Sequence, residues 1–182
     1  MARREKVHVE VDDTTIASGD PHAVLHPVWW RANIYDGPGM YDYSLREFSR
    51  SQRLVFAILW YIAEVNNGGH HQFYSNSTGI VWRDAMDGFE AIGVPRAARI
   101  VAVSADRLGG SPSQDREERY DQMEEFAPDF DDLNDAFYQL QKKVNLNEQM
   151  MSFIRARPAD FYFSGTIERV VLPLRGEHDR SA

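Results

Sequence analysis

The most distinctive hydrophobic pattern in the sequence is an almost unbroken apolar run from Leu54 to Ala63. The run is too short to cross a bilayer and too long for an ordinary strand, so it predicts a helix that is apolar on most of its sides. Such a helix is buried. The pair Gly68 and Gly69 follows it and predicts its end, with Gly68 in the left-handed conformation of a C-terminal cap. We therefore expect one buried central helix around which the rest of the chain packs.

Helical signals continue on both sides of this run. Capping-box spacing occurs at Ser44 to Glu47 and again at Ser49 to Gln52, just before the central helix. A further helix is expected from Ile80 to Ile92, and it places apolar residues on its inner side. Those inner residues are Val81, Trp82, Ala85, Phe89 and Ile92. Later helices are expected from Pro95 to about Leu108, from Asp115, around Leu133 to Leu140, and from Asn145 to a stop at Pro158.

Two short segments have the alternating pattern of strands. Lys6 to Val11 alternates polar and apolar residues, and Thr166 to Leu172 is the other good candidate. We expect the two termini to pair, or one of them to add to a neighbouring molecule, which leaves a homodimer open. The residues between them and the helices, Val11 to Tyr43, are rich in turn residues and predict an irregular arm. Trp29 and Trp30 are interpreted as anchors of that arm rather than as a ligand-stacking platform.

These elements predict an all-α, single-domain bundle of about six to eight helices around a buried central helix, with a short two-stranded β pairing of the termini. A chain of 182 residues fits one domain. Residues 1–43 are expected to form an N-terminal strand and an irregular arm, residues 44–163 the helical domain, and residues 164–182 a C-terminal strand with a frayed tail from Gly176.

Composition adds the expected environment. The chain has no cysteine, so disulfides and thiolate chemistry are excluded. The charged N-terminus lacks a hydrophobic signal segment and no apolar run is long enough to cross a membrane, so we expect a cytoplasmic protein.

The net charge of −8 is concentrated in one segment. Between Ser111 and Asp135 there are ten acidic residues and two basic ones, Arg116 and Arg119, so the rest of the chain carries 18 charges of each sign. This distribution disfavours direct binding to nucleic acid or to an anionic membrane, and it favours a basic partner.

A polar motif follows the central helix, and it resembles the pattern of a known domain family. The motif residues are Glu64, Val65, Asn66, Asn67, Gly68, Gly69, Gln72, Phe73, Asn76 and Gly79. They are similar to the EVNNGG-x-x-QF-x-N-x-x-G motif of a DNA-mimic protein-like domain family, most of whose members have no assigned function. The resemblance extends from about Leu45 to Phe161, through Gln52, Arg53, Ala91 to Gly93, Asp115 to Arg119 and Ile154 to Phe161. It implies an all-helical fold.

The polar residues of the motif are predicted to be structural. A buried helix that ends inside a fold leaves carbonyl and N–H groups that need partners. Four side-chain amides in the motif can donate and accept at once, those of Asn66, Asn67, Gln72 and Asn76. Glu64 is expected to accept from such donors or to pair with a cation such as Arg53. On this interpretation, Asn67→Ala lowers the melting temperature markedly.

The alternative is a small enzyme or ligand-binding protein with a polar pocket around Glu64, His70 and His71. The spacing of zinc-protease ligands is absent, and the family resemblance implies an aromatic residue where His70 stands, so we expect no metal. The sequence also lacks a G-x-S-x-G motif and a phosphate loop, so no cofactor and no catalytic residue are assigned and a non-enzyme is favoured.

The acidic segment has two interpretations. On a helix that begins at Asp115, five carboxylates fall within an arc of about 120°, while Tyr120, Met123 and Phe126 occupy the opposite side. The charged face is either a solvated surface, or it replaces a phosphate backbone, because its carboxylates recur about every 5 Å. We hypothesise a DNA mimic whose acidic face binds a basic DNA-binding protein or transcription regulator. Its contact residues would be Glu117, Glu118, Asp121, Glu124 and Glu125.

Overall fold

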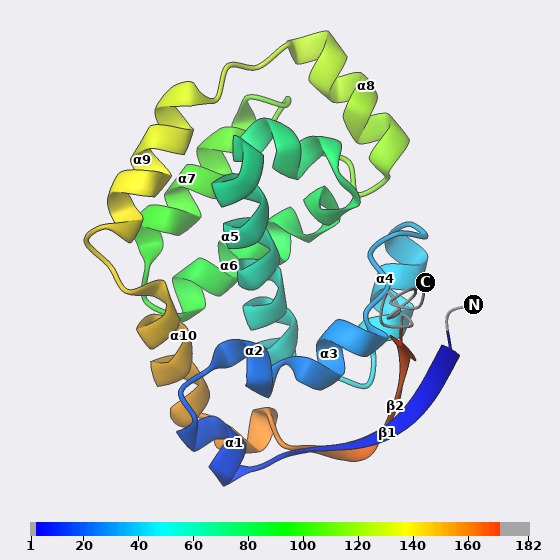
Figure 1. The fold of residues 1–182 in the computed structure, drawn as a ribbon. Helices are drawn as coiled ribbons and strands as arrows, with labels where there is room; N and C mark the ends of the chain where they lie inside the picture. The colour runs from blue at the N-terminus through cyan, green and yellow to red at the C-terminus, as the bar shows by residue number, and fades with distance from the viewer. Residues whose placement is uncertain (1–2, 172–182) are drawn as a thin grey trace, which may run out of the picture.

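The computed structural model describes residues 3–171 and confirms a mostly helical fold. Figure 1 shows the helices grouped around α5, with the two strands at one end of the molecule. In chain order the helices are α1 (Asp13–Ala17), α2 (Pro21–Val24), α3 (His26–Arg31), α4 (Pro38–Leu45), α5 (Arg50–Ser75), the 3-10 helix η1 (Ser77–Val81), α6 (Trp82–Ala91), α7 (Pro95–Asp106), α8 (Arg116–Phe126), α9 (Asp131–Gln141), α10 (Leu146–Arg155) and the 3-10 helix η2 (Pro158–Asp160).

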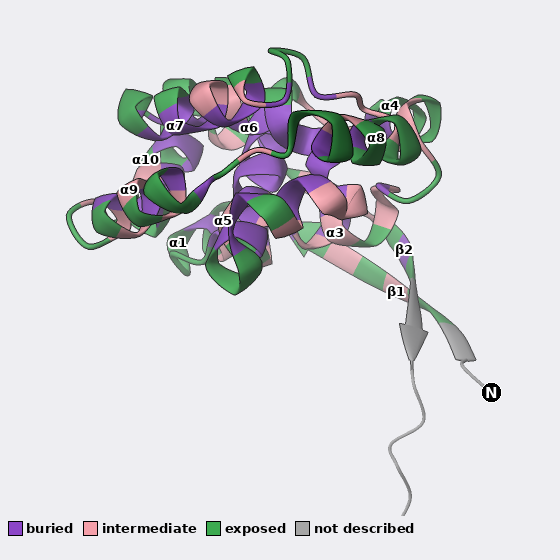
Figure 2. Cartoon of the chain, turned by 90° about the horizontal axis from the view of Figure 1, so that it is seen from above, coloured by how far each residue is buried: buried purple, intermediate pink, exposed green. Residues whose placement is uncertain are grey.

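The central helix α5 is buried as its apolar run predicts. Residues 54–59 are all buried, and Figure 2 shows α5 as the purple centre of the molecule. Its start is the predicted capping box, in which Ser49 Oγ accepts from Gln52 N (3.0 Å) and Gln52 Oε1 accepts from Ser49 N (2.9 Å). Across residues 3–171, none of the helices combines the length and the apolar character needed to cross a membrane.

The capping box predicted at Ser44 to Glu47 is wrong. Ser44 lies inside α4, where its hydroxyl donates to the carbonyl of Tyr41 (2.9 Å) and accepts from the N–H of Asn33 (2.9 Å). The spacing of Ser44 and Glu47 fits a helix start, but α4 already begins six residues earlier, with Pro38 at its first position.

The N-terminal arm is more regular than its turn residues predict. It forms α1 to α4, and the same turn residues begin these helices: Asp12 and Asp20 are N-caps, and Pro21 and Pro38 stand in first turns. This is why the described residues contain more helices than the six to eight expected.

The two strands pair within one chain, as one of the two predicted arrangements requires. β1 (Arg3–Val11) and β2 (Phe163–Val171) are antiparallel, with Val7 opposite Ile167 and Val11 opposite Phe163. The tail predicted to fray from Gly176 lies outside the described residues.

The paired tryptophans divide between core and surface. Trp29 packs edge-on against Phe56 and Trp60 of α5, with ring centroids 5.0 Å and 4.9 Å away, so it anchors the arm as expected. Trp30 is 40% exposed, and its indole N–H donates to His26 Nε2 (3.0 Å).

Candidate functional site

The glycine pair breaks α5 without ending it. Gly68 has φ −151° and Gly69 has φ +70°, so the residue with positive φ is Gly69 and not Gly68, and helical structure resumes as far as Ser75. A Cβ on Gly69 would lie 2.7 Å from the side-chain amide of Asn134 in α9. Only glycine fits at position 69, because the backbone has a positive φ there and because α9 approaches it closely.

The carboxylate of Glu64 joins the two halves of the broken helix. Its Oε2 accepts from the amide of Gln72 (2.6 Å) and from that of Asn76 (2.9 Å). Glu64 lies before the break, whereas Gln72 and Asn76 lie after it, so these bonds hold the second half of α5 against the first. Of the two partners expected for Glu64, the amides are the ones observed; Arg53 pairs instead with Asp42 and Asp84.

The two asparagines before the break differ. The amide of Asn66 forms a reciprocal pair with that of Gln141 in α9, at 3.1 Å and 2.7 Å. Asn67 is exposed, and within residues 3–171 its side chain forms no hydrogen bond. The hydroxyl of Tyr138 donates to the carbonyl of Val65 (2.8 Å) and satisfies one carbonyl at the break. The structural interpretation thus fits Asn66, Gln72 and Asn76, but not Asn67.

His70 is buried as part of the core. Its ring Nδ1 and its backbone N–H both bond to Asn134 Oδ1, at 2.6 Å and 2.9 Å, and its Nε2 lies 2.6 Å from the hydroxyl of Tyr61. With Asn134 as acceptor, Nδ1 carries the proton and Tyr61 donates to Nε2. Burial lowers the pKa of His70 to about 4, so the ring is neutral at physiological pH.

His71 points away from this group. It is exposed, and its Nδ1 is 3.5 Å from Ser75 Oγ. Glu64, His70 and His71 therefore have separate partners and are not joined by a hydrogen bond. Among residues 3–171, no three histidine, cysteine, aspartate or glutamate side chains are arranged to hold a metal ion.

Arg119 attaches the acidic helix α8 to the end of α5. The side chain is fully buried, and its Nε donates to the carbonyl of Tyr74 (2.8 Å) while Nη2 donates to that of Asn76 (2.7 Å). Nη1 donates to the carbonyl of Ser113 (2.7 Å) and, at longer range, to the two carbonyls that follow it. Burial lowers the pKa of Arg119 to about 10, which leaves it charged at neutral pH. One side chain thus fixes α5, the loop before α8 and α8 itself.

Gly79 makes room for this side chain. A Cβ at Gly79 would lie 2.5 Å from Arg119 Nε and 2.9 Å from the carbonyl of Phe73. The glycine of the motif and the arginine of the acidic segment are therefore parts of one contact. Sequence reasoning missed Arg119. The signal available was its place four residues before Met123, on the side of α8 that faces the core.

The acidic face of α8 is exposed, and its charges are not paired with a cation within the described part of the chain. Figure 2 shows α8 mostly green, at the surface of the molecule. Within residues 3–171, none of its five carboxylates takes part in an ion pair. Among the residues that the structure describes, the only side-chain bond to them is from Ser113 Oγ to Glu118 (2.8 Å). The exposed acidic residues are Glu117, Glu118, Asp121, Glu124 and Glu125.

The inner side of α8 differs from the expected one. Met123 is buried, but Tyr120 is 51% exposed and Phe126 is 45% exposed. The buried guanidinium of Arg119 lies on this inner side instead, where it donates to the carbonyls at the end of α5.

Comparison with known proteins yields one match. A family model described as DMP19-like protein matches residues 46–157. This range is more than half of the chain and contains α5 to α10. It therefore includes both the polar motif from Glu64 to Gly79 and the acidic helix α8. The terminal sheet and α1 to α4 lie outside it. No curated protein and no solved structure matches the chain.

Proposed function

Because the chain belongs to the DMP19-like protein family, we propose that it is a non-enzymatic binding protein that acts as a DNA mimic. In this role the acidic face of α8 takes the place of a phosphate backbone and binds a basic DNA-binding protein. The observation that carries the proposal is the lack of any ion pair to the five carboxylates within the described residues.

The environment of α8 supports this role. Asp115 caps the helix by accepting from the N–H groups of Glu117 (2.9 Å) and Glu118 (3.1 Å), and Arg119 fixes it to α5. The acidic face is therefore held on a rigid element before a partner arrives, which reduces the conformational entropy lost on binding. Arginine and lysine side chains of the partner would bind the carboxylates through charge-assisted hydrogen bonds, and salt would weaken them.

The net charge of −8 supports a basic partner and opposes direct contact with nucleic acid. Catalysis is not part of the proposal. The polar side chains that most resemble catalytic residues, Glu64 and His70, form hydrogen bonds that hold the fold together.

The proposal is tested by retention of partners from a lysate of the source cells at low and at high salt. The test variant replaces the four glutamates of the acidic face by glutamine and Asp121 by asparagine. A basic DNA-binding protein should be retained at low salt, released at high salt, and lost with the variant.

A control variant separates the acidic face from overall charge. It replaces five glutamates elsewhere by glutamine, and it should retain the partner as the unmodified chain does. Equal loss with both variants would show that net charge alone is responsible, and retention by the test variant would reject the acidic face as the binding site. The control positions are Glu5, Glu10, Glu47, Glu90 and Glu168.

A further inference from the structure

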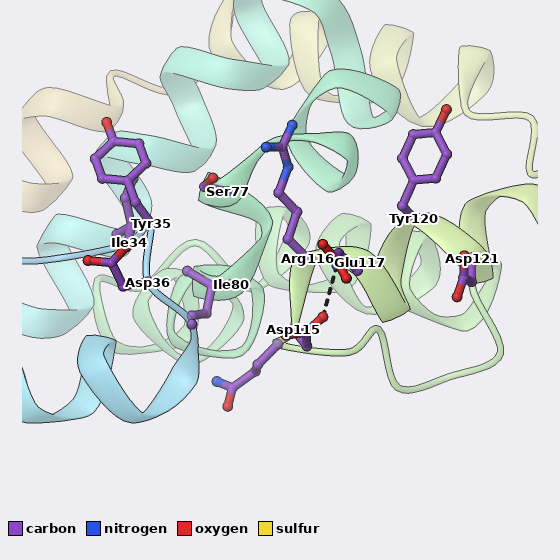
Figure 3. A pocket seen from close by; sticks show the side chains of 12 residues that line it. Ile34, Tyr35, Asp36, Ser77, Ile80, Asp115, Arg116, Glu117, Tyr120 and Asp121 are labelled. Atoms are coloured by element: carbon purple, nitrogen blue, oxygen red, sulfur yellow. Dashed lines mark hydrogen bonds between the residues drawn. The ribbon is translucent and has the colours of Figure 1, made fainter.

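A cleft of about 750 Å³ lies beside the first turns of α8. One wall is the turn from Ile34 to Gly37, just before α4, and the other is the segment from Gln114 to Asp121. Ser77 and Ile80 of η1 also line it. The cleft is thus adjacent to the acidic face but is built from three separate parts of the chain, as Figure 3 shows.

Two tyrosines stand on opposite sides of this cleft. Figure 3 places Tyr35 on one side and Tyr120 on the other, with Arg116 and Glu117 between them. Tyr35 is 72% exposed and Tyr120 is 51% exposed, and neither hydroxyl has a hydrogen bond within residues 3–171. Large side chains left this exposed at the rim of a cleft are typical of contact residues.

The charge inside the cleft is negative. Four carboxylates and one guanidinium line it. Asp36, Glu117 and Asp121 are in no ion pair among the described residues. The fourth carboxylate, Asp115, caps α8. The cation is Arg116, whose Nε donates to the carbonyl of Ser75 (3.0 Å), so that it is tied to the end of α5.

Aromatic faces together with carboxylates that are in no ion pair among the described residues suit one side chain better than any other. A guanidinium is planar, stacks on an aromatic ring and donates from its edge to carboxylates, whereas an ammonium group offers only a compact charge. We propose that this cleft receives an arginine side chain from the basic partner, with Tyr35 and Tyr120 as the stacking residues. The inference rests on the proposed function, and it adds that the partner is recognised for arginine and not only for positive charge.

The volume of the cleft agrees with such an occupant. It exceeds the space of a single side chain and can admit an arginine together with the neighbouring residues of an exposed segment. The negative charge argues against an anionic occupant, whether a nucleotide or a phosphate.

The test measures binding of fluorescent oligo-arginine and oligo-lysine peptides of equal length to the full chain, by fluorescence anisotropy at low salt. Arginine peptides also bind simple acidic surfaces, so the informative quantity is the ratio of the two dissociation constants in matched variants. In the unmodified chain, oligo-arginine should bind about tenfold more tightly than oligo-lysine. In Tyr35→Leu/Tyr120→Leu the ratio should fall to about twofold, while oligo-lysine binding stays unchanged.

The matched control is Tyr162→Leu. Tyr162 is 46% exposed, and its hydroxyl donates to Asp13 (2.5 Å) of α1, at the other end of the molecule from α8 in Figure 1. It is thus an exposed tyrosine beside a carboxylate outside the cleft, and its loss should leave the ratio as it is. Circular dichroism checks that the double variant and Tyr162→Leu are folded.

The outcomes separate this inference from the proposed function. If the double variant keeps the preference, or the unmodified chain shows none, the cleft is not an arginine site, although the acidic face can still bind basic proteins. If the variant that neutralises the acidic face binds both peptides as tightly as the unmodified chain, the proposed function fails. If neither peptide binds, both are overturned.

Discussion

The two ends of α5 hold buried charges in different ways. Beside its first turn, the carboxylate of Asp84 accepts from Arg53 (2.6 Å), from Arg50 and from the hydroxyl of Tyr41 (2.9 Å). Beside its last turn, Arg119 donates only to backbone carbonyls and contacts no carboxylate among the described residues. Both charges have the sign that the helix dipole favours at their end, negative near the N-terminus and positive near the C-terminus.

The difference lies in what each charge holds together. Asp84 is compensated by other side chains, and one of them, Arg50, is 52% exposed, so water can replace part of the contact. Arg119 is compensated by the main-chain carbonyls of two segments, the end of α5 and the loop before α8, and water does not reach it. The first arrangement is a local ion cluster, whereas the second determines where the acidic helix lies. The following experiments test this contrast, from the largest expected effect to the smallest.

Replacing Arg119 by methionine should cause the largest loss. It removes five hydrogen bonds and leaves buried carbonyls without donors, so we expect the free energy of unfolding to fall by about 4 kcal/mol. Urea denaturation measures it. The control is Arg116→Met, at an exposed arginine with a single bond to Ser75, which should cost less than about 1 kcal/mol. Similar losses in the two variants would contradict the role given to Arg119.

His70 stands at the glycine break within α5, and it extends the comparison to a buried polar side chain that is uncharged. Its pKa is about 4 in the folded chain and about 6.5 in an unfolded one, so the unfolded state binds the proton more readily between these values. Stability should therefore fall as the pH is lowered from about 6.5 to 4, by up to about 3 kcal/mol from this group.

The measurement is thermal unfolding across that pH range for three proteins, namely the unmodified chain, His70→Phe and His71→Phe. The first variant should lose part of the pH dependence, although it is less stable at neutral pH because Asn134 and Tyr61 lose a partner. The second, at an exposed histidine, should keep the dependence. An identical pH profile in all three proteins would mean that His70 is not held neutral by burial.

Asp84→Asn should have a smaller effect than Arg119→Met or the protonation of His70. The substitution keeps the shape of the side chain, and both arginines can turn to water, so we expect a loss of about 2 kcal/mol in urea denaturation. Asp87→Asn, which removes the exposed partner of Arg50, should cost less than about 0.5 kcal/mol. A loss at Asp84 larger than that at Arg119 would reverse the comparison.

Asn67→Ala should have the smallest effect. Its side chain is exposed and unbonded within residues 3–171, so the change in unfolding free energy should stay within about 0.5 kcal/mol. Asn76→Ala, which removes a donor to the nearly buried Glu64, should cost about 1 to 2 kcal/mol. A marked loss at Asn67 would instead support the structural role that the motif predicts for it.

The sequence predicted what depends on local pattern. The apolar run of α5, the capping box at Ser49 and the alternation of the terminal strands are local signals, and all three appear in the structure. The contacts of His70 with Asn134 and of Gly79 with Arg119 depend on packing between distant segments, which no local spacing encodes. The short helices α1 to α4 were missed because the residues that break one helix also begin the next.

The pairing of β1 with β2 also bears on the order of folding. Arg3 lies opposite Val171, so nearly the whole described chain separates the two strands. Contacts between residues so far apart in sequence form late, because the loop between them must close first. During synthesis, β1 leaves the ribosome long before β2 exists. The helical body around α5 is therefore expected to assemble first, with β1 and β2 pairing only after β2 has been synthesised.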